Sequence, residues 1–172
     1  AAGYKAELIR EYFNDEQWDV QVQVVDSGDV DILQRLKDCR PFLKQDFLVC
    51  YGDTLADVDI GELCRFHKHH GGAASITSYP HQSQFGLLEL QTDGKVTAFV
   101  EKPILDKWIN IGYFYLTSQA LTKIDTCNSF VNYLETLVQD EMLHSFRHCG
   151  VHITVNTVKE LSDAEENIGV FA

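Results

Sequence analysis

The fold class of this chain is indicated by residues 47–53, which read FLVCYGD. Five apolar residues in a row predict a fully buried central strand, and Gly52-Asp53 then ends that strand with a turn. In α/β proteins, ligands bind at the carboxyl ends of such strands, so the position of Asp53 is typical of a binding site. A Gly-Asp step after a strand is also a common plain turn, and the choice between the two interpretations depends on the rest of the chain.

Helices and strands are predicted in alternation on both sides of this stretch. Asp59-x-x-Glu62 and Thr157-x-x-Glu160 are capping boxes, and Thr92-Asp93-Gly94 between two apolar runs is a hairpin signal. The predicted helices are 4–14, 29–39, 59–70, 117–124, 130–142 and one after 157, and the predicted strands are 19–25, 45–51, 73–79, 85–91, 96–102, 109–116, 144–148 and 152–156. This order favours an α/β fold with a mixed, mostly parallel sheet and an antiparallel hairpin insertion. No linker divides the chain, so we expect one domain over residues 1–172.

Composition excludes several classes of partner. The 172 residues carry a net charge of -12, whereas nucleic acids and anionic membranes both bind basic surfaces. No stretch reaches the roughly 20 apolar residues of a membrane span, and the first residues lack a signal peptide, so we expect a cytoplasmic protein. The five cysteines form no C-x-x-C pair and are interpreted as reduced, inert thiols.

Polar residues and glycines lie at the starts or ends of three further predicted strands. Glu101-Lys102-Pro103 ends the second hairpin strand, either as a solvated strand end or as a site where Glu101 accepts from sugar hydroxyls and Lys102 pairs with a phosphate. Asn110 and Gly112 open the strand in WINIGYF at 108–114, where a glycine lets a ligand approach the backbone. Gly86 after Phe85 is a similar point, although strand glycines alone usually mark bulges.

The order of these stretches is more specific than any single one. Together they resemble the sugar-1-phosphate nucleotidylyltransferases, also called NDP-sugar pyrophosphorylases, and most closely the glucose-1-phosphate cytidylyltransferase branch. The likeness spans almost the whole chain and lies in GYK at 3–5, EYF at 11–13, VVDSG at 24–28, RLK at 35–37, YGDTLADVDI at 51–60, FHKHHG at 66–71, FGLLEL at 85–90, EKP at 101–103 and WINIGYF at 108–114.

The resemblance implies a Rossmann-like three-layer nucleotidyltransferase fold and a specific reaction. In that reaction a sugar 1-phosphate attacks the α-phosphorus of a nucleoside triphosphate and expels pyrophosphate, with Mg²⁺ and protein cations on the phosphates. It also implies roles for the residues named above. Asp53 and Lys102 are then catalytic, Asp53 binds the metal, and the substrate lies against Gly52, Gly86, Glu101, Lys102, Asn110 and Gly112.

The chain departs from the family in three places. The family's first strand and its G-x-G-T-R-L triphosphate loop do not occur in these residues, so the resemblance implies an N-terminally truncated domain with little or no transferase activity. Ile32-Leu33-Gln34 replaces the T-G-G of cytidylyltransferase-like members, which weakens the prediction of CTP as substrate. Asn156-Thr157 stands where the family has an Asp-Thr step, so Asn156 is a candidate second metal ligand, although an amide binds Mg²⁺ less well than a carboxylate.

Other functions stay open on the sequence alone. A shortened homologue could keep the sugar site and bind sugar phosphates or nucleotide sugars without turnover. A nicotinamide-dependent dehydrogenase would need G-x-G-x-x-G, which the chain does not contain. His67, His69 and His70 are interpreted as helix-surface histidines rather than zinc ligands. A truncated sheet would leave an apolar edge, so we also expect either a homo-oligomer or poor solubility.

Overall fold

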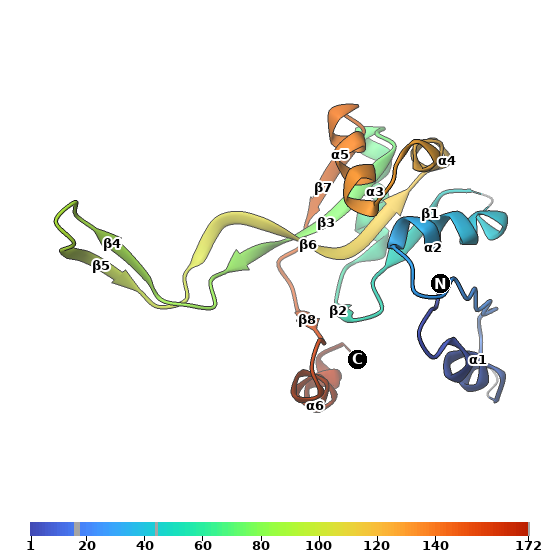
Figure 1. The fold of residues 1–172 in the computed structure, drawn as a ribbon, viewed down its shortest axis with the longest axis horizontal. Coiled ribbons are helices and arrows are strands. Elements are labelled where there is room, and N and C mark those ends of the chain that lie inside the picture. The colour runs from blue at the N-terminus through green and yellow to red at the C-terminus, as the bar shows by residue number, and fades with distance from the viewer. Residues whose placement is uncertain (16–17, 44, 172) are drawn as a thin grey trace. The chain divides into compact units, whose positions relative to one another are not determined.

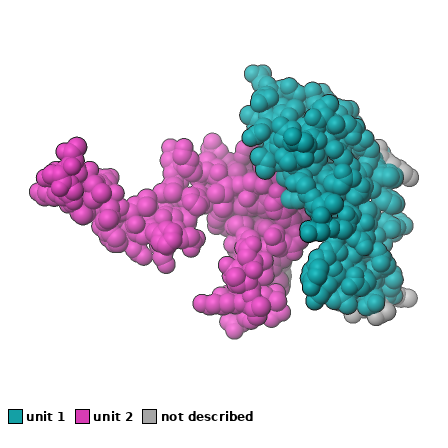
Figure 2. Space-filling model, in the orientation of Figure 1, with its two compact units in different colours: residues 1–47, 72–74, 116–143 teal, residues 48–71, 75–115, 144–172 magenta. Residues whose placement is uncertain are grey.

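The computed structural model describes residues 1–15, 18–43 and 45–171, and it divides into two compact units (Figure 2). Unit 1 consists of Ala1–Phe47, Gly72–Ala74 and Leu116–Leu143, and unit 2 consists of Leu48–Gly71, Ser75–Tyr115 and His144–Ala172. Each unit is therefore built from segments that are far apart in the sequence. None of the helices in the described part of the chain combines the length and apolarity that a bilayer crossing requires.

Unit 1 is mainly helical. Its helices are α1 (Ala6–Asp15), α2 (Ile32–Cys39), η1 (Arg40–Phe42), α4 (Ser118–Leu121), η2 (Ile124–Thr126) and α5 (Phe130–Gln139). The carboxylate of Asp31 caps α2 by accepting from the backbone N–H of Leu33 at 2.7 Å, and it also accepts from Phe130 N–H at 2.9 Å. One side chain therefore satisfies the starts of two helices, which otherwise leave their first N–H groups unpaired.

The predicted strand at 19–25 is wrong. Residues 19–25 belong to no strand, and the backbone pairing next to them is an isolated parallel bridge between Ala2 and Asp26. Alternating apolar residues form a strand only where a neighbouring backbone offers a ladder of hydrogen bonds. Here Ala2 N–H donates to the carbonyl of Val25 at 2.7 Å, and Ser27 N–H donates to the carbonyl of Ala2 at 3.0 Å.

The central sheet has the strand order β1-β6-β3-β7 (Figure 1). Its strands are β1 (Phe47–Cys50), β6 (Ile104–Leu116), β3 (Ala74–Gln82) and β7 (Leu143–Arg147). Backbone bonds at both ends show that β3 and β6 are antiparallel, since Ser83 N–H donates to Pro103 and Thr117 N–H donates to Ala73. Strands β3 and β7 are parallel, since Ala74 N–H donates to Met142 and His148 N–H donates to Ser78. The predicted α/β class with a mixed sheet is confirmed.

Strand β1 differs from its prediction as a buried central strand. It lies at the edge of the sheet, and its burial alternates along the strand, with Leu48 39% exposed. A continuous apolar run is typical of a strand covered on both sides. Within the described residues, no strand pairs with the outer edge of β1.

Helix α3 (Ile60–His70) covers one face of the sheet. Asp59 caps the helix by accepting from Glu62 N–H at 2.8 Å, and Gly71 ends it with a left-handed φ of +66°, as the sequence predicted. Side chains alternate along a strand, so every second residue of β6 and β3 faces this helix. The resulting core of unit 2 contains Val58, Leu63 and Ile111, with Tyr79, Tyr113, Tyr115 and Phe146 packed against it.

Two antiparallel ribbons and a last helix complete unit 2. Strand β2 (Thr54–Ala56) pairs with β8 (His152–Thr154), and β4 (Leu87–Leu90) pairs with β5 (Val96–Val100) as the predicted hairpin. Strand β2 was not predicted. Helix α6 (Val158–Asn167), followed by η3 (Ile168–Phe171), starts at the predicted capping box, where Glu160 N–H donates to Thr157 Oγ1 and Asn156 N–H donates to Glu160 Oε2.

Candidate active site

Asp53 lies in the turn between β1 and β2, with its side chain exposed. The hydroxyl of Thr54 donates to its carboxylate at 3.3 Å, and its backbone carbonyl accepts from Val155 N–H at 2.8 Å. No Lys, Arg or His of the described residues forms an ion pair with this carboxylate. The β2–β8 ribbon thus fixes the backbone at Asp53 and leaves its negative charge available.

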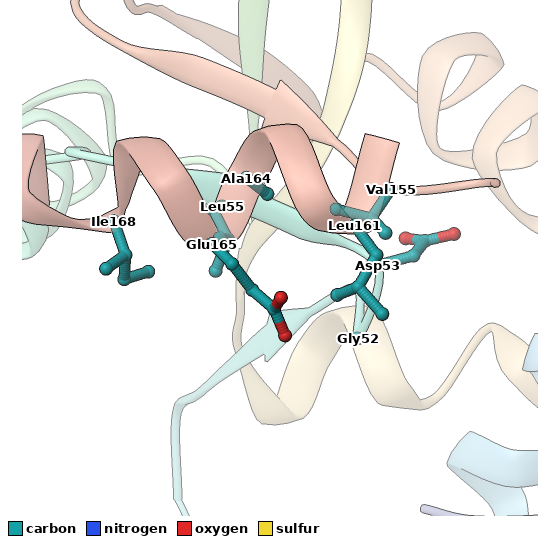
Figure 3. Close-up of a pocket in the computed structure, with 8 residues that line it drawn as sticks. All are labelled: Gly52, Asp53, Leu55, Val155, Leu161, Ala164, Glu165 and Ile168. Atoms are coloured by element: carbon teal, nitrogen blue, oxygen red, sulfur yellow. The ribbon is translucent and has the colours of Figure 1, made fainter. Parts of the chain in front are cut away.

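A cavity of about 420 Å³ lies beside this turn (Figure 3). Most of its lining is apolar and comes from the β2–β8 ribbon and α6, and the residues are Gly52, Asp53, Leu55, Val155, Leu161, Ala164, Glu165 and Ile168. The carboxylates of Asp53 and Glu165 point in different directions in Figure 3. The carboxylate of Asp53 is therefore not paired with that of Glu165 in one acidic cluster.

Asn110 and Gly112 of β6 are brought next to the same turn through Tyr51. Asn110 Oδ1 accepts from Gly112 N–H at 2.8 Å, and Asn110 Nδ2 donates to Tyr51 Oη at 3.4 Å. Gly112 has a φ of +80°, and a Cβ at this position would meet the Tyr51 ring, whose Cδ2 would be only 2.5 Å away. Tyr51 N–H also donates to Gly112 O at 3.0 Å, and Tyr51 directly precedes Gly52.

Tyr51 is a site residue that the sequence analysis did not identify. Its signal was its place immediately before Gly52-Asp53, but an aromatic residue there is equally typical of a strand end. Only the fold shows that its ring occupies the space left free by Gly112.

The remaining candidates gather at the base of the β4–β5 hairpin. Extending the Leu87–Val100 register by one residue places Gly86 opposite Glu101, and a Cβ on Gly86 would lie 2.8 Å from Glu101 Oε2. It would also lie 2.6 Å from the Phe99 ring, so a larger residue here would require the side chains of Phe99 and Glu101 to shift. Lys102 is exposed, has a left-handed φ of +44°, and its carbonyl accepts from Gln82 Nε2 at 3.1 Å.

The predicted residues therefore form two groups in the structure. Gly52, Asp53, Asn110 and Gly112 are connected through Tyr51, whereas Gly86, Glu101 and Lys102 lie at the hairpin base. Between them, the six residue steps from Ile104 to Asn110 correspond to about 20 Å of strand. Neither Glu101 nor Lys102 lines the cavity at Asp53, so the structure does not place all predicted residues in one pocket.

Asp53 offers few protein ligands to a metal ion, which suits Mg²⁺ better than a metal that needs all its ligands from side chains. Within the described part of the chain, no group of three or more His, Cys, Asp or Glu side chains could hold an ion. Mg²⁺ commonly binds one or two carboxylates and takes its other ligands from water and substrate phosphates. Asn156 follows Val155, which pairs with Asp53, so the second candidate ligand lies one residue beyond this contact.

The predicted surface position of the α3 histidines is correct for His69 but wrong for His67, which is only 4% exposed. The Ser75 hydroxyl lies 2.9 Å from His67 Nδ1 and 2.7 Å from His70 Nε2. Because a hydroxyl carries one proton, at least one of these rings donates to Ser75. His70 also stacks on His144, with ring centroids 3.9 Å apart. Burial, followed by the nearby histidines His144, His67 and His69, lowers the pKa of His70 from its ordinary 6.5 to about 4.

Comparison with known proteins agrees with these features. The family model described as "Nucleotidyl transferase" matches residues 2–145. The chain is 33% identical to the glucose-1-phosphate cytidylyltransferase of Salmonella typhi, over 92% of this chain and 72% of that protein. The same enzyme of Salmonella typhimurium gives the same three values. Among solved structures, HddC from Yersinia pseudotuberculosis superposes with a TM-score of 0.67 at 18% identity, covering 96% of this chain and 76% of that one.

The last of these comparisons supports the fold, and the first two identify the family. The matched region includes the turn at Asp53, the hairpin base and the strand carrying Asn110, and so contains the functional residues predicted from the sequence except Asn156. The chain is thus a member of the nucleotidyl transferase family, whose relatives include the glucose-1-phosphate cytidylyltransferases.

Proposed function

We propose that this chain is the sugar-phosphate-binding part of a nucleotidylyltransferase that joins a nucleoside triphosphate to a sugar 1-phosphate. In the reaction, a phosphate oxygen of the sugar 1-phosphate bonds to the α-phosphorus, and the bond from that phosphorus to the bridging oxygen breaks to release pyrophosphate. The observation that supports this most directly is the contact of Asn110 and Gly112 with Tyr51, immediately beside the exposed carboxylate of Asp53.

Positioning is the main contribution of these residues, because phosphoryl-group transfer needs little covalent help from the protein. Asn110 is held by its bond to Gly112 N–H, so its amide is oriented before a sugar arrives. Asp53, with Asn156 beyond it, would hold Mg²⁺. When bound, this ion would offset the negative charge that develops on the phosphates.

Glu101 and Lys102 act on the sugar hydroxyls and the phosphate in this proposal. Glu101 presents its carboxylate across from Gly86, and the ring of Phe99 also lies beside this glycine. For these two residues to contact the same substrate as Asp53, the hairpin base must come closer to the end of β1 in the substrate complex. The proposal therefore requires a rearrangement along the first half of β6.

Turnover by these residues alone is proposed to be low, because the G-x-G-T-R-L loop that grips the triphosphate does not occur among them. The segment that replaces the T-G-G of cytidylyltransferase-like members is also unlike a loop that contacts the nucleotide base. Ile32 and Leu33 form the first turn of α2, and Leu33 is only 2% exposed. This feature favours the second candidate function, in which the chain binds sugar phosphates or nucleotide sugars without turnover.

Calorimetry with glucose 1-phosphate and with CTP tests the proposal, together with an assay for pyrophosphate release. We expect heat from glucose 1-phosphate that the variant Asn110→Ala reduces, and little heat from CTP. The matched control is Asn128→Ala, an exposed asparagine in unit 1. Binding of neither ligand by the unaltered chain would contradict the proposal, and release of pyrophosphate at a substantial rate would refute the proposed loss of turnover.

A further inference from the structure

Trp108 and Arg147 form a cation–π pair on the sheet of unit 2. The guanidinium carbon of Arg147 lies 5.0 Å from the centre of the Trp108 ring, a distance typical of a cation–π contact. Both side chains are accessible, and Trp108 is 42% exposed. None of the functional residues predicted from the sequence belongs to this pair.

The sheet places this pair on the same face as Asn110. Trp108 and Asn110 are two residues apart in β6, so their side chains leave the strand on the same side. Strand β3 lies between β6 and β7 (Figure 1). It contributes the small residue Ser78, whose hydroxyl is 2.6 Å from that of Ser145. Ser145 is two residues before Arg147 in β7, so Arg147 also belongs to this face, opposite the residues that pack on α3.

The guanidinium of Arg147 has donors to spare. Within the described residues it makes the cation–π contact with Trp108 and forms no hydrogen bond or ion pair. A guanidinium has five N–H donors, and a contact between its central carbon and an aromatic ring leaves these groups available to other acceptors.

We propose that Arg147, oriented by Trp108, binds the phosphate of the sugar 1-phosphate while Asn110 on the same face contacts the sugar. This inference rests on the proposed function. A planar guanidinium binds two phosphate oxygens at once, and the phosphate group carries nearly two negative charges at neutral pH. Arg147 therefore supplies a second cation in addition to Lys102, and it does so from the sheet rather than from the hairpin.

The test uses the full chain carrying Trp18→Phe, which leaves Trp108 as its single tryptophan. We expect glucose 1-phosphate to change the fluorescence of Trp108, and glucose to cause no such change at the same concentration. Arg147→Gln is expected to weaken binding of glucose 1-phosphate by about 10-fold or more, the usual effect of losing a charge-assisted hydrogen bond. Arg147→Lys keeps the charge but loses the planar fork, and we expect it to restore less than half of the lost affinity.

The matched control is Lys107→Gln, which removes the same charge one residue before Trp108 but on the other face of β6. Equal affinity of Arg147→Gln and the unaltered chain would overturn this inference and leave the proposed function standing. An equal loss in Lys107→Gln would also overturn it, because a general charge effect would then explain the result. Failure of the unaltered chain to bind glucose 1-phosphate by calorimetry would instead remove the proposed function, and this inference with it.

Discussion

At the scale of single residues, two glycines of the candidate site allow neighbouring side chains to pack against the backbone. Gly112 has a left-handed φ, and the space that its Cβ would fill is occupied by the ring of Tyr51. This close fit connects Asn110 to the turn at Asp53. Phe99 and Glu101 lie close to Gly86, so two of the three glycines that the sequence assigned to the site are places where a neighbouring side chain approaches the backbone. Nothing lies within 4 Å of a Cβ added at the third, Gly52.

Gly112→Ala should therefore destabilise the protein. A non-glycine residue in the left-handed region costs roughly 1–2 kcal/mol, and overpacking adds roughly 1–3 kcal/mol, so we expect a loss of about 3 kcal/mol in the free energy of unfolding. Urea denaturation measures it. Gly94→Ala is the control, because Gly94 has a φ of +85° but nothing within 4 Å of the added Cβ, so only the backbone cost should remain.

The identity of the site residues could be predicted only in part. Asp53, Glu101 and Asn110 were identified because charged and amide residues stand out at the ends of apolar runs. Tyr51 and the Trp108–Arg147 pair were missed, because their contacts join strands far apart in the sequence. Whether two side chains meet across an intervening strand depends on strand order, which local patterns do not contain.

At the scale of elements, the sequence correctly predicted the helix caps and the hairpin turn, because the residues that form each of them are close together in the chain. Asp59 and Thr157 cap their helices as expected, and Thr92-Asp93-Gly94 forms the hairpin turn. The wrong predictions concern pairing and burial. Residues 19–25 alternate like a strand but lack a ladder, and β1 reads as a central strand but lies at an edge. These outcomes depend on which backbone lies alongside, and not on the segment itself.

The contact of α3 with β3 and β7 is expected to respond to pH. Because the pKa of His70 is about 4 in the folded chain and 6.5 when unperturbed, the unfolded chain binds more protons between these two values. Stability linked to His70 is fully present above pH 6.5 and is lost as the pH falls toward 4. Denaturation curves at several pH values should show this loss, and His70→Gln should make it smaller.

His69→Gln serves as the control for this prediction, since His69 is the adjacent residue on the same helix but is exposed. Because His69 is the smallest of the influences that lower the pKa of His70, this variant should change the pH dependence much less than His70→Gln does. Equal slopes of stability against pH for His70→Gln and the unaltered chain would show that the packing of His70 against His144 and Ser75 does not set the titration.

At the scale of the whole molecule, the open edge of β1 predicts association between copies. An unpaired edge strand offers free N–H and C=O groups, and the exposed Leu48 adds apolar surface to it. Natural proteins usually protect such edges with charged residues, especially lysine, yet residues 47–51 read FLVCY and contain none. We therefore expect the homo-oligomer suggested by the sequence to form through this edge.

Leu48→Lys places a charge on that edge and should shift the chain toward the monomer, because pairing two copies would then bury or juxtapose like charges. Gel filtration at several protein concentrations measures the shift. Val131→Lys is the matched control, since Val131 is 65% exposed on helix α5, where no strand edge is available for pairing. A monomer at all concentrations for the unaltered chain, or an equal shift in both variants, would show that β1 does not mediate association.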